Sequence, residues 1–291
     1  MSHVEPFRVG PFEVSTVCQG FAPLDLADEC PGRDVDWHAE RERHPWAFHD
    51  DDSWAWHVHA FAVRGPDGTA MVDSGLGAYP PFRPWGQGSG STPDEAYASA
   101  DVDPAQVRLV VLSHLHADHA GGTWAADAPR FPNARYVLHE ADLEFFTSSP
   151  DPNAYVAVDE LRRIEALGML DADPADREVM PGIRVVHTPG HTPGHRSVLL
   201  EARDESLLLT GDLVHVPVQA AHPTWLSSHD DDPETGAASR AAILGRAVTG
   251  AWLVGVQHFA RPFGRVDDLG WVTSRSSTTT PTLPDRSEGL G

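Results

Sequence analysis

The sequence predicts an α/β protein, and three observations predict it. Short apolar runs typical of β-strands occur along most of the chain. Segments with helical spacing lie between them, for example at residues 233–249. Histidines and aspartates stand just past several of the apolar runs, where a strand would end. We therefore expect strands and helices that together hold a polar site at the strand ends.

Length and composition are those of an ordinary globular protein. The 291 residues allow one large domain or two small ones. We expect a single domain over residues 1–272 and a disordered tail over 273–291, which is rich in serine and threonine. With 41% hydrophobic residues and no long apolar run, no membrane partner is expected. Residues 1–6 lack the features of a secretory signal, so we expect a cytoplasmic protein.

Charge and cysteine content exclude nucleic-acid-binding and disulfide-rich classes of protein. The 21 Lys and Arg against 43 Asp and Glu give a net charge of −22, which repels phosphate backbones, so nucleic acid is not expected as a partner. Cys18 and Cys30 are too few for a disulfide framework and too far apart for a C-x-x-C pair. We interpret both as reduced structural residues. The expected partner is a small-molecule substrate, and a homodimer remains open.

The N-terminal part is predicted to be rich in strands. Residues 7–18 alternate loosely and indicate a first strand, and residues 58–64 and 69–73 indicate a hairpin closed by Gly65–Gly68. An unusual segment at 25–57 carries five large aromatic residues among acids and histidines. These are Trp37, Trp46, Phe48, Trp54 and Trp56. They form either a satellite core or the wall of a binding pocket, and both interpretations stay open.

The remaining elements follow in order. After a Pro- and Gly-rich loop, a short helix is predicted near 93–100 and a buried strand at 109–112. The later predicted strands are 135–139, 183–187, 197–201, 206–210 and 252–256, and the later predicted helices begin at 140 and cover 154–170 and 233–249. Alternating strands and helices agree with an α/β fold.

A metal-binding motif, His-x-His-x-Asp-His, follows the strand at 109–112. Side chains of an extended segment alternate, so His114 and His116 project to one side and can reach one ion. The chain must then turn, which directs Asp118 and His119 towards a second ion, and Gly121-Gly122 permits tight backbone geometry. The motif therefore predicts two neighbouring metals.

Four ligands cannot complete two metal ions, so further ligands are expected at other strand ends. His191 follows the strand at 183–187 between two Pro-Gly pairs. Asp212 follows the strand at 206–210 and is placed as a carboxylate that could bridge two cations. His258 follows the strand at 252–256. With the motif, these residues bring the candidate ligands to seven.

Together with Asp73, these motifs resemble the ordered signature of the metallo-β-lactamase superfamily, in its lactonase-like and organophosphate-hydrolase-like branch. The resemblance covers roughly residues 7–272. It implies an αββα sandwich of two mixed β-sheets flanked by helices, with a dinuclear site at one edge. It further implies the ligand sets: His114, His116 and His191 for the first metal, Asp118, His119 and His258 for the second, Asp212 as the bridge, and Asp73 as a support behind the site.

The resemblance implies hydrolysis by a hydroxide that bridges two divalent metals, because such ions lower the pKa of a shared water towards neutrality. Asp118 is the expected catalytic residue that accepts its proton. Zinc is the first expectation for the metals, and manganese or iron(II) remain open because His and Asp ligands suit all three. Asp212 stands where the cysteine-ligand β-lactamases need a thiolate, so antibiotic hydrolysis is not expected.

The expected substrate is a small, neutral, hydrophobic ester or lactone. Aromatic residues from 25–57, with Phe82, Trp85 and Trp225, would hold its apolar part over the metals. A thioesterase similar to glyoxalase II and a phosphotriester hydrolase are alternatives, as is a non-hydrolytic metal enzyme of the same fold.

The roles of the other histidines are predicted from their positions in the sequence. His195 is expected to have a structural role or to support a metal ligand from behind. We expect satisfied strand residues at His139 and His187, and surface residues beside an acidic run at His57 and His59. Metal support, pocket lining and packing all stay open for His215 and His222.

Overall fold

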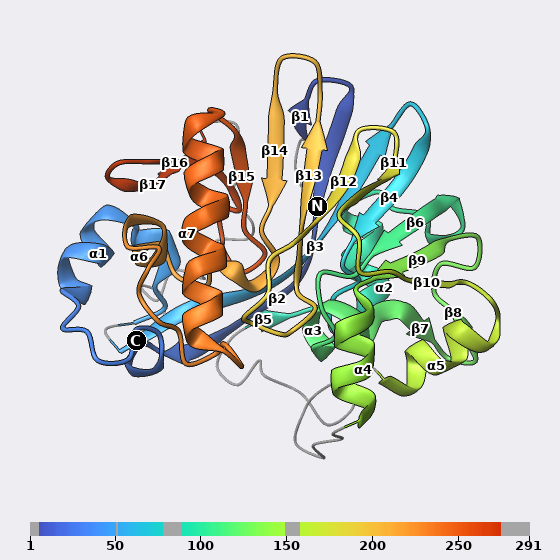
Figure 1. The fold of residues 1–291 in the computed structure, drawn as a ribbon, viewed down its shortest axis with the longest axis horizontal. Coiled ribbons are helices and arrows are strands. Elements are labelled where there is room, and N and C mark those ends of the chain that lie inside the picture. Colours follow the sequence, from blue (N-terminus) through green and yellow to red (C-terminus); the bar gives the residue numbers. More distant parts are fainter. Residues whose placement is uncertain (1–5, 51, 78–88, 149–157, 275–291) are drawn as a thin grey trace, which may run out of the picture.

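The structure is a computed structural model, and it describes residues 6–50, 52–77, 89–148 and 158–274. Two large β-sheets face each other, with helices on both outer faces (Figure 1). Each sheet contains parallel and antiparallel neighbours. The predicted αββα sandwich of two mixed sheets is therefore confirmed.

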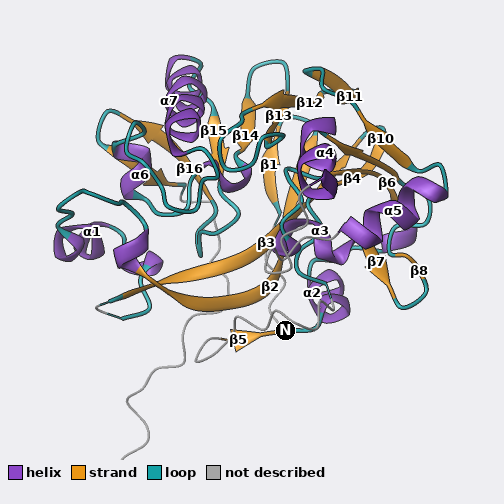
Figure 2. Cartoon of the chain, turned by 60° about the horizontal axis from the view of Figure 1, so that its bottom comes forward, coloured by secondary structure: helices purple, strands orange, loops and turns teal. Residues whose placement is uncertain are grey.

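The first sheet is built from the N-terminal half of the chain, in the order β1-β2-β3-β4-β6-β9-β10, with β5 paired to β2. Its strands are β1 (Phe7–Val9), β2 (Phe12–Asp25), β3 (Ser53–Gly65), β4 (Gly68–Val72), β5 (Ser89–Gly90), β6 (Val107–Val111), β9 (Arg135–Leu138) and β10 (Leu170–Ala172). A separate small hairpin joins β7 (Trp124–Ala125) and β8 (Ala128–Pro129). The outer halves of β2 and β3 pair with each other beyond the rest of the sheet and curve towards the opposite side of the molecule (Figure 2).

The second sheet comes from the C-terminal half and runs in chain order. Its strands are β11 (Arg177–Met180), β12 (Ile183–His187), β13 (Arg196–Glu201), β14 (Ser206–Leu209), β15 (Leu253–Gly255), β16 (Phe263–Asp267) and β17 (Gly270–Thr273). Strand β15 lies parallel to β14 because the long helix α7 (Pro233–Thr249) returns the chain between them.

Helices cover the outer face of each sheet. On the first sheet, Tyr97 of α2 (Pro93–Ser99), Phe146 of α4 (Glu140–Ser148) and Leu161 of α5 (Val158–Ala166) enter one apolar cluster with the strand residues. On the second sheet, α7 and the short α6 (Val218–Ala221) do the same. A third cluster fills the space between the sheets with Val, Leu and Phe from both. Two further helices, α1 (Trp37–Arg43) and α3 (Ala117–Ala120), lie near the ends of the strands.

Several predicted elements differ from the structure. Residues 7–18 are not one strand: the chain turns at Gly10, whose φ is +51°, so that β1 and β2 form a hairpin and β2 continues to Asp25. The predicted helix 154–170 ends at Ala166, and Gly168, with a φ of +70°, turns the chain into β10; residues 154–157 lie outside the described residues. The short strands β10, β11, β16 and β17 were not predicted.

The segment 25–57 is in part an extension of the first sheet. Its last residues belong to β3, and Trp54 and Trp56 are buried. The prediction that His57 and His59 are surface residues is wrong. They are 5% and 1% exposed, because β3 is covered on both faces along nearly all of its length. In the part of the chain that the structure describes, no helix has the length and apolar character to span a bilayer.

Candidate metal centre

The sequence motif lies where strand β6 ends between its parallel neighbours β4 and β9. The chain then runs through His114 to His116, which precedes the single turn of α3. Behind this turn Gly122 donates its N–H to the Gly75 carbonyl at 2.8 Å, and a Cβ on Gly122 would lie 2.0 Å from the Ser74 oxygen. The tight geometry that the two glycines predict is thus needed to pack α3 against the loop after β4.

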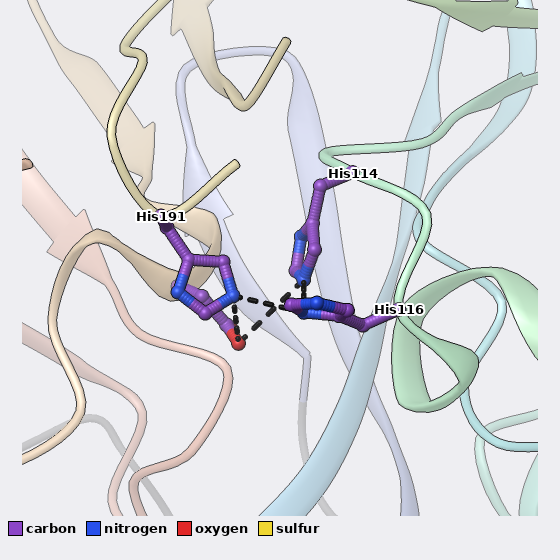
Figure 3. A group of neighbouring side chains, drawn as sticks. His114, His116 and His191 are labelled. Atoms are coloured by element: carbon purple, nitrogen blue, oxygen red, sulfur yellow. Dashed lines mark hydrogen bonds and ion pairs between the residues drawn. The ribbon is translucent and has the colours of Figure 1, made fainter. Parts of the chain in front are cut away.

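One cluster of candidate ligand atoms joins His114, His116, His191 and Asp212 (Figure 3). The Nδ1 atom of His116 lies 2.9 Å from His114 Nε2 and 3.0 Å from His191 Nε2. The Oδ2 atom of Asp212 lies 3.4 Å from His191 Nε2 and 3.7 Å from His114 Nε2. Three imidazoles, from loops that follow strands of two different sheets, thus point at one place (Figure 3).

A second cluster joins Asp118, His119 and His258 to the other oxygen of Asp212. Asp212 Oδ1 lies 3.0 Å from His119 Nε2 and 2.9 Å from His258 Nε2. Asp118 Oδ2 lies 3.2 Å from His119 Nε2 and 3.8 Å from His258 Nε2. Asp212 therefore belongs to both clusters, one carboxylate oxygen on each side.

The donor atoms of the second cluster fit a cation better than they fit each other. His119 Nε2, His258 Nε2 and Asp212 Oδ1 are buried and close together, yet none of the three has a hydrogen-bond partner of proper geometry among the described residues. Unsatisfied buried polar atoms are costly and call for an explanation. Imidazole and carboxylate donors are ligands for zinc and related divalent ions. The residues present thus fit two metal ions.

Electrostatics separate the histidines into two groups. Burial, with positive neighbours, holds the pKa of His114 and His191 well below the usual value, so both are neutral and offer a lone pair. Burial also opposes charge on His119, but Asp212, Asp118 and Asp73 raise its pKa well above the usual value. His119 and His258 in turn hold the pKa of Asp212 far below normal despite its burial. The carboxylates of the second cluster therefore stabilise a positive charge next to them.

Asp73 supports the site from behind, in agreement with its expected place. Its Oδ2 lies 2.8 Å from His119 Nδ1, and its Oδ1 accepts the Ser113 backbone N–H at 2.7 Å. Gln257 donates to the same carboxylate at 3.1 Å. The φ of Asp73 is +63°, a strained value for a residue with a side chain. The contact between Asp73 and His119 Nδ1 fixes the ring of His119 so that its Nε2 faces the cluster.

His195 also acts through its neighbours. Its Nε2 accepts the Asp212 backbone N–H at 3.0 Å, and its Nδ1 lies 3.0 Å from the Thr188 carbonyl. Both ring nitrogens are thereby used, and the loop that carries Asp212 is anchored. This geometry agrees with the structural role predicted for His195.

The other histidines divide between the site and its surroundings. His215 Nε2 lies 3.5 Å from Asp212 Oδ2, and its ring stacks on His258 at 5.7 Å, so it borders both clusters. His222 instead stacks on Trp225 at 4.0 Å. His139 and His187 stack on each other at 4.1 Å, and neither belongs to a candidate ligand group of the described residues.

Sequence reasoning missed the carboxylate that holds the His191 loop. Asp142, in the first turn of α4, accepts the Gly194 N–H at 2.6 Å and the Thr192 hydroxyl at 2.9 Å. Asp230 was missed as well, and its Oδ1 lies 3.4 Å from His191 Nδ1. Neither residue stands in a motif. Their contacts span long distances along the chain, and no local pattern reports them.

Two of the five aromatic residues singled out in segment 25–57 pack beside the second cluster. Trp54 and Trp56 lie 6.4 and 5.3 Å from the His258 ring, and the half-buried Trp46 lies 5.2 Å from the ring of Phe259. Trp54 is 2% exposed, and its Nε1 donates to Glu29 at 2.6 Å, so it is core. Trp46 and Trp225 are partly buried at the edge of this aromatic cluster. Phe82 and Trp85 lie outside the described residues.

Comparison with known proteins links this geometry to a family. The profile described as the metallo-beta-lactamase superfamily matches residues 54–249. An N-acyl homoserine lactonase of a Bacillus species is 34% identical over 118 residues, which are 38% of this chain and 40% of that protein. The N-acyl homoserine lactonase AttM of Azorhizobium caulinodans is 30% identical over 177 residues, which are 54% of this chain and 65% of its own length.

A solved structure shows the same fold. It is described as AidC, a dizinc quorum-quenching lactonase, in complex with a product N-hexnoyl-L-homoserine. Its TM-score to this chain is 0.76 at 19% identity, and the match covers 94% of this chain and 99% of that one.

Proposed function

The chain belongs to the metallo-β-lactamase superfamily, and from this premise we propose that it is a dinuclear metal-dependent hydrolase that opens neutral, hydrophobic lactones or cleaves related esters. The observation that carries the proposal is the position of Asp212. One carboxylate lies between two clusters of histidine and aspartate, and each cluster holds three further donors. A bridging carboxylate with three protein ligands on either side is an arrangement for two ions and not for one.

In this proposal His114, His116 and His191 hold the first ion, and Asp118, His119 and His258 hold the second. Zinc is proposed first, supported by the donor types and by the dizinc description of AidC. Two such ions, when bound, would supply Lewis acidity for the substrate carbonyl and would make a water acidic near neutral pH.

The protein's own residues supply the proton transfer and the positioning. Burial opposes a charge on Asp118, but His119 outweighs it and keeps the pKa of Asp118 below its usual value, so it is a charged carboxylate. We propose Asp118 as the proton acceptor for the attacking water and as the donor to the leaving alcohol. Asp118 and His116 are less completely enclosed than His114, His119 and His258, which places the solvent-facing side of the centre next to them.

The substrate class is supported by two observations. The relatives described above are named as N-acyl homoserine lactonases. Trp46 and Trp225 are partly buried at the rim of an aromatic cluster that continues to His258, so an apolar acyl chain would find apolar surface there. The net charge of −22 works against highly anionic substrates.

The test is a hydrolysis screen of the zinc-loaded protein. The panel contains N-acyl homoserine lactones with short and long acyl chains, aryl esters, thioesters and a phosphotriester. We expect lactones or esters to be hydrolysed fastest, with kcat/KM rising with acyl length by at most about 0.8 kcal/mol of transition-state binding per buried methylene. Preference for the thioester or the phosphotriester would replace the proposed substrate class, and inactivity on the whole panel would contradict hydrolysis.

A further inference from the structure

A second group of metal-ligating side chains lies on the long hairpin of the first sheet, outside the two clusters described above. Cys18 on β2 stands directly opposite His59 on β3 in the antiparallel register. His57 precedes His59 by two residues and therefore projects from the same face of β3. A bulge between Cys18 and Gly20 shifts the register by one residue at this point. The fold thus brings a thiol and two imidazoles together on one face.

The three side chains are close enough to share one ion. One donor atom from each residue lies within 4.8 Å of the other two, and Cys18 Sγ lies 3.9 Å from His57 Nδ1. Metal–sulfur and metal–nitrogen bonds of about 2.3 and 2.0–2.1 Å put the two ligand atoms roughly 3.6–3.8 Å apart around a zinc-like ion. The sulfur and nitrogen are therefore already at nearly the separation that coordination requires.

His59 needs an occupant that the described protein does not provide. It is 1% exposed, and neither of its ring nitrogens has a hydrogen-bond partner within residues 6–50, 52–77, 89–148 and 158–274. Leaving a buried polar group unsatisfied destabilises the folded protein. Phe61, two residues further along the same face, packs on Phe263 of the opposite sheet at 5.4 Å. An apolar side chain would thus be more stable than an imidazole at position 59, unless the imidazole binds a ligand.

We propose that Cys18, His57 and His59 form a third metal site, which binds one soft cation, with monovalent copper as the best match. Thiolate and imidazole donors suit copper(I), and three donors are sufficient for it. The ion displaces the thiol proton, which passes to solvent, so that the bound unit of one thiolate, two neutral imidazoles and Cu⁺ carries no net charge. A divalent ion would leave one uncompensated positive charge in a buried place.

The charged groups around the site agree with a neutral complex. Burial, and then the charge on His258, lower the pKa of His57 to about 3. Burial, with His57 and His258, also holds the pKa of His59 well below its usual value. Burial raises the pKa of the Cys18 thiol to about 12. The imidazoles are therefore neutral with free lone pairs, and a coordinated metal is what would remove the thiol proton.

This site shares no residue with the two clusters, yet it touches them through the backbone. His57 donates its N–H to the His258 carbonyl at 3.3 Å, and His258 Nδ1 lies 2.6 Å from the His57 carbonyl oxygen. The proposal does not depend on the hydrolase function. It adds an ion with a different ligand chemistry beside the expected dinuclear centre.

The experiment compares the full-length, zinc-loaded protein with Cys18→Ser, His59→Gln and the matched control Cys30→Ser. Cys30 is the other cysteine of the chain and is buried in a different cluster with Leu26 and Trp54. Each protein is titrated anaerobically with copper(I) against a chromophoric copper(I) chelator, and X-ray absorption at the copper edge reports sulfur in the coordination sphere. Melting temperatures confirm that each variant is folded.

We expect one tightly bound copper(I) with a sulfur ligand in the wild type and in Cys30→Ser. Cys18→Ser should lose the sulfur signal and bind at least tenfold more weakly, and His59→Gln should also bind at least tenfold more weakly. Equal binding by the wild type and Cys18→Ser, or copper without sulfur in the wild type, would overturn the site. A third zinc that Cys18→Ser loses, without any copper(I) binding, would overturn the choice of copper. Because Cys18→Ser changes a single atom, the test stands even if His59→Gln does not fold.

Discussion

At the scale of single residues, Asp212 is the side chain that both candidate clusters share. Its Oδ1 faces His119 and His258, and its Oδ2 faces His114, His191 and His215. No other residue in the described part of the chain belongs to both ligand groups. Losing it would leave two cations without the negative charge between them.

We therefore expect Asp212→Ala to lower kcat/KM more than His195→Ala. Asp212→Ala removes a ligand from both ions. His195→Ala removes only a contact behind the loop that carries Asp212, and the loss of such a supporting contact costs roughly 10–100-fold in metal affinity or activity. Elemental analysis and hydrolysis kinetics on both variants check this, and Asp212→Ala should show the larger loss of metal. Equal losses of metal and activity would mean that the ligands are assigned wrongly.

Asp142 gives a prediction about pH. Burial raises its pKa to about 7, against the Thr192 and Gly194 hydrogen bonds that favour its charge. A carboxyl whose pKa is raised by folding stabilises the protein below its unfolded pKa, and this contribution is lost as pH rises through the folded value. The free energy of unfolding of the wild type, minus that of Asp142→Asn, should thus decrease as pH rises from about 4 to 8.

Urea unfolding of the two proteins at several pH values measures this difference. Asp159→Asn serves as the control, because Asp159 lies at the exposed start of α5. The control should follow the wild type at every pH. A difference between Asp142→Asn and the wild type that stays constant with pH would contradict the raised pKa.

Individual site residues were predictable where each follows its own strand. His114, His191, Asp212 and His258 all stand just past an apolar run, and the structure brings these strand ends together. His57 and His59 were not predictable, because alternation with Trp56 and Val58 resembles a half-exposed strand. Only the packing of other parts of the folded chain on β3 buries the residues of both its faces.

At the scale of elements, the prediction succeeded where local signals mark both ends. Helix α7 agrees with its predicted bounds because Asp232 caps it, Pro233 occupies its first turn and Gly250 ends it. Strands β16 and β17 carry no comparable signal: they are short and are held by pairing with each other and with β15. Tertiary pairing therefore decides the elements that local pattern leaves open.

The aromatic cluster yields a prediction that separates its members. Trp54→Ala should destabilise the fold by about 3–5 kcal/mol, because a fully buried indole and its hydrogen bond to Glu29 are lost. Trp46→Ala should change stability less and raise KM for long-chain lactones more than it lowers kcat, because Trp46 lies at the rim.

Denaturant unfolding and kinetics with short and long acyl chains measure the two effects. For Trp54 the structure favours the satellite core among the two interpretations that the sequence left open. If Trp46→Ala leaves KM unchanged for every chain length, the rim does not contact substrate. The aromatic segment would then be satellite core throughout.

At the scale of the whole molecule, metal and fold should be coupled. The candidate ligands come from both sheets, so two bound ions would stabilise the folded chain by mass action, by about 2.7 kcal/mol for each ion present at 100 times its Kd. We expect two zinc ions per chain in Cys18→Ser, which lacks the sulfur of the third site, and a lower melting temperature after chelation. Elemental analysis and calorimetry check both. One ion or fewer after zinc reloading would contradict the dinuclear centre.

The C-terminal tail gives a simple test of the predicted domain boundary. Residues 275–291 lie outside the described residues, and Leu283 and Leu290 are their only large apolar side chains. So little apolar surface cannot offset the entropy of ordering such a tail. A chain truncated after Ser274 should keep its melting temperature and kcat/KM. A drop in either quantity would show that the tail packs on the protein.

The division of the two sheets along the chain has a consequence for fragment complementation. All strands of the first sheet precede residue 173, and all strands of the second follow residue 176. A cut in the connection between them would leave the histidine motif of 114–119 on one fragment and His191, Asp212 and His258 on the other. Neither fragment alone carries a complete cluster. Hydrolysis by the mixed fragments would therefore report their reassembly. Added metal would stabilise the complex of the two fragments, because its ligands come from both of them.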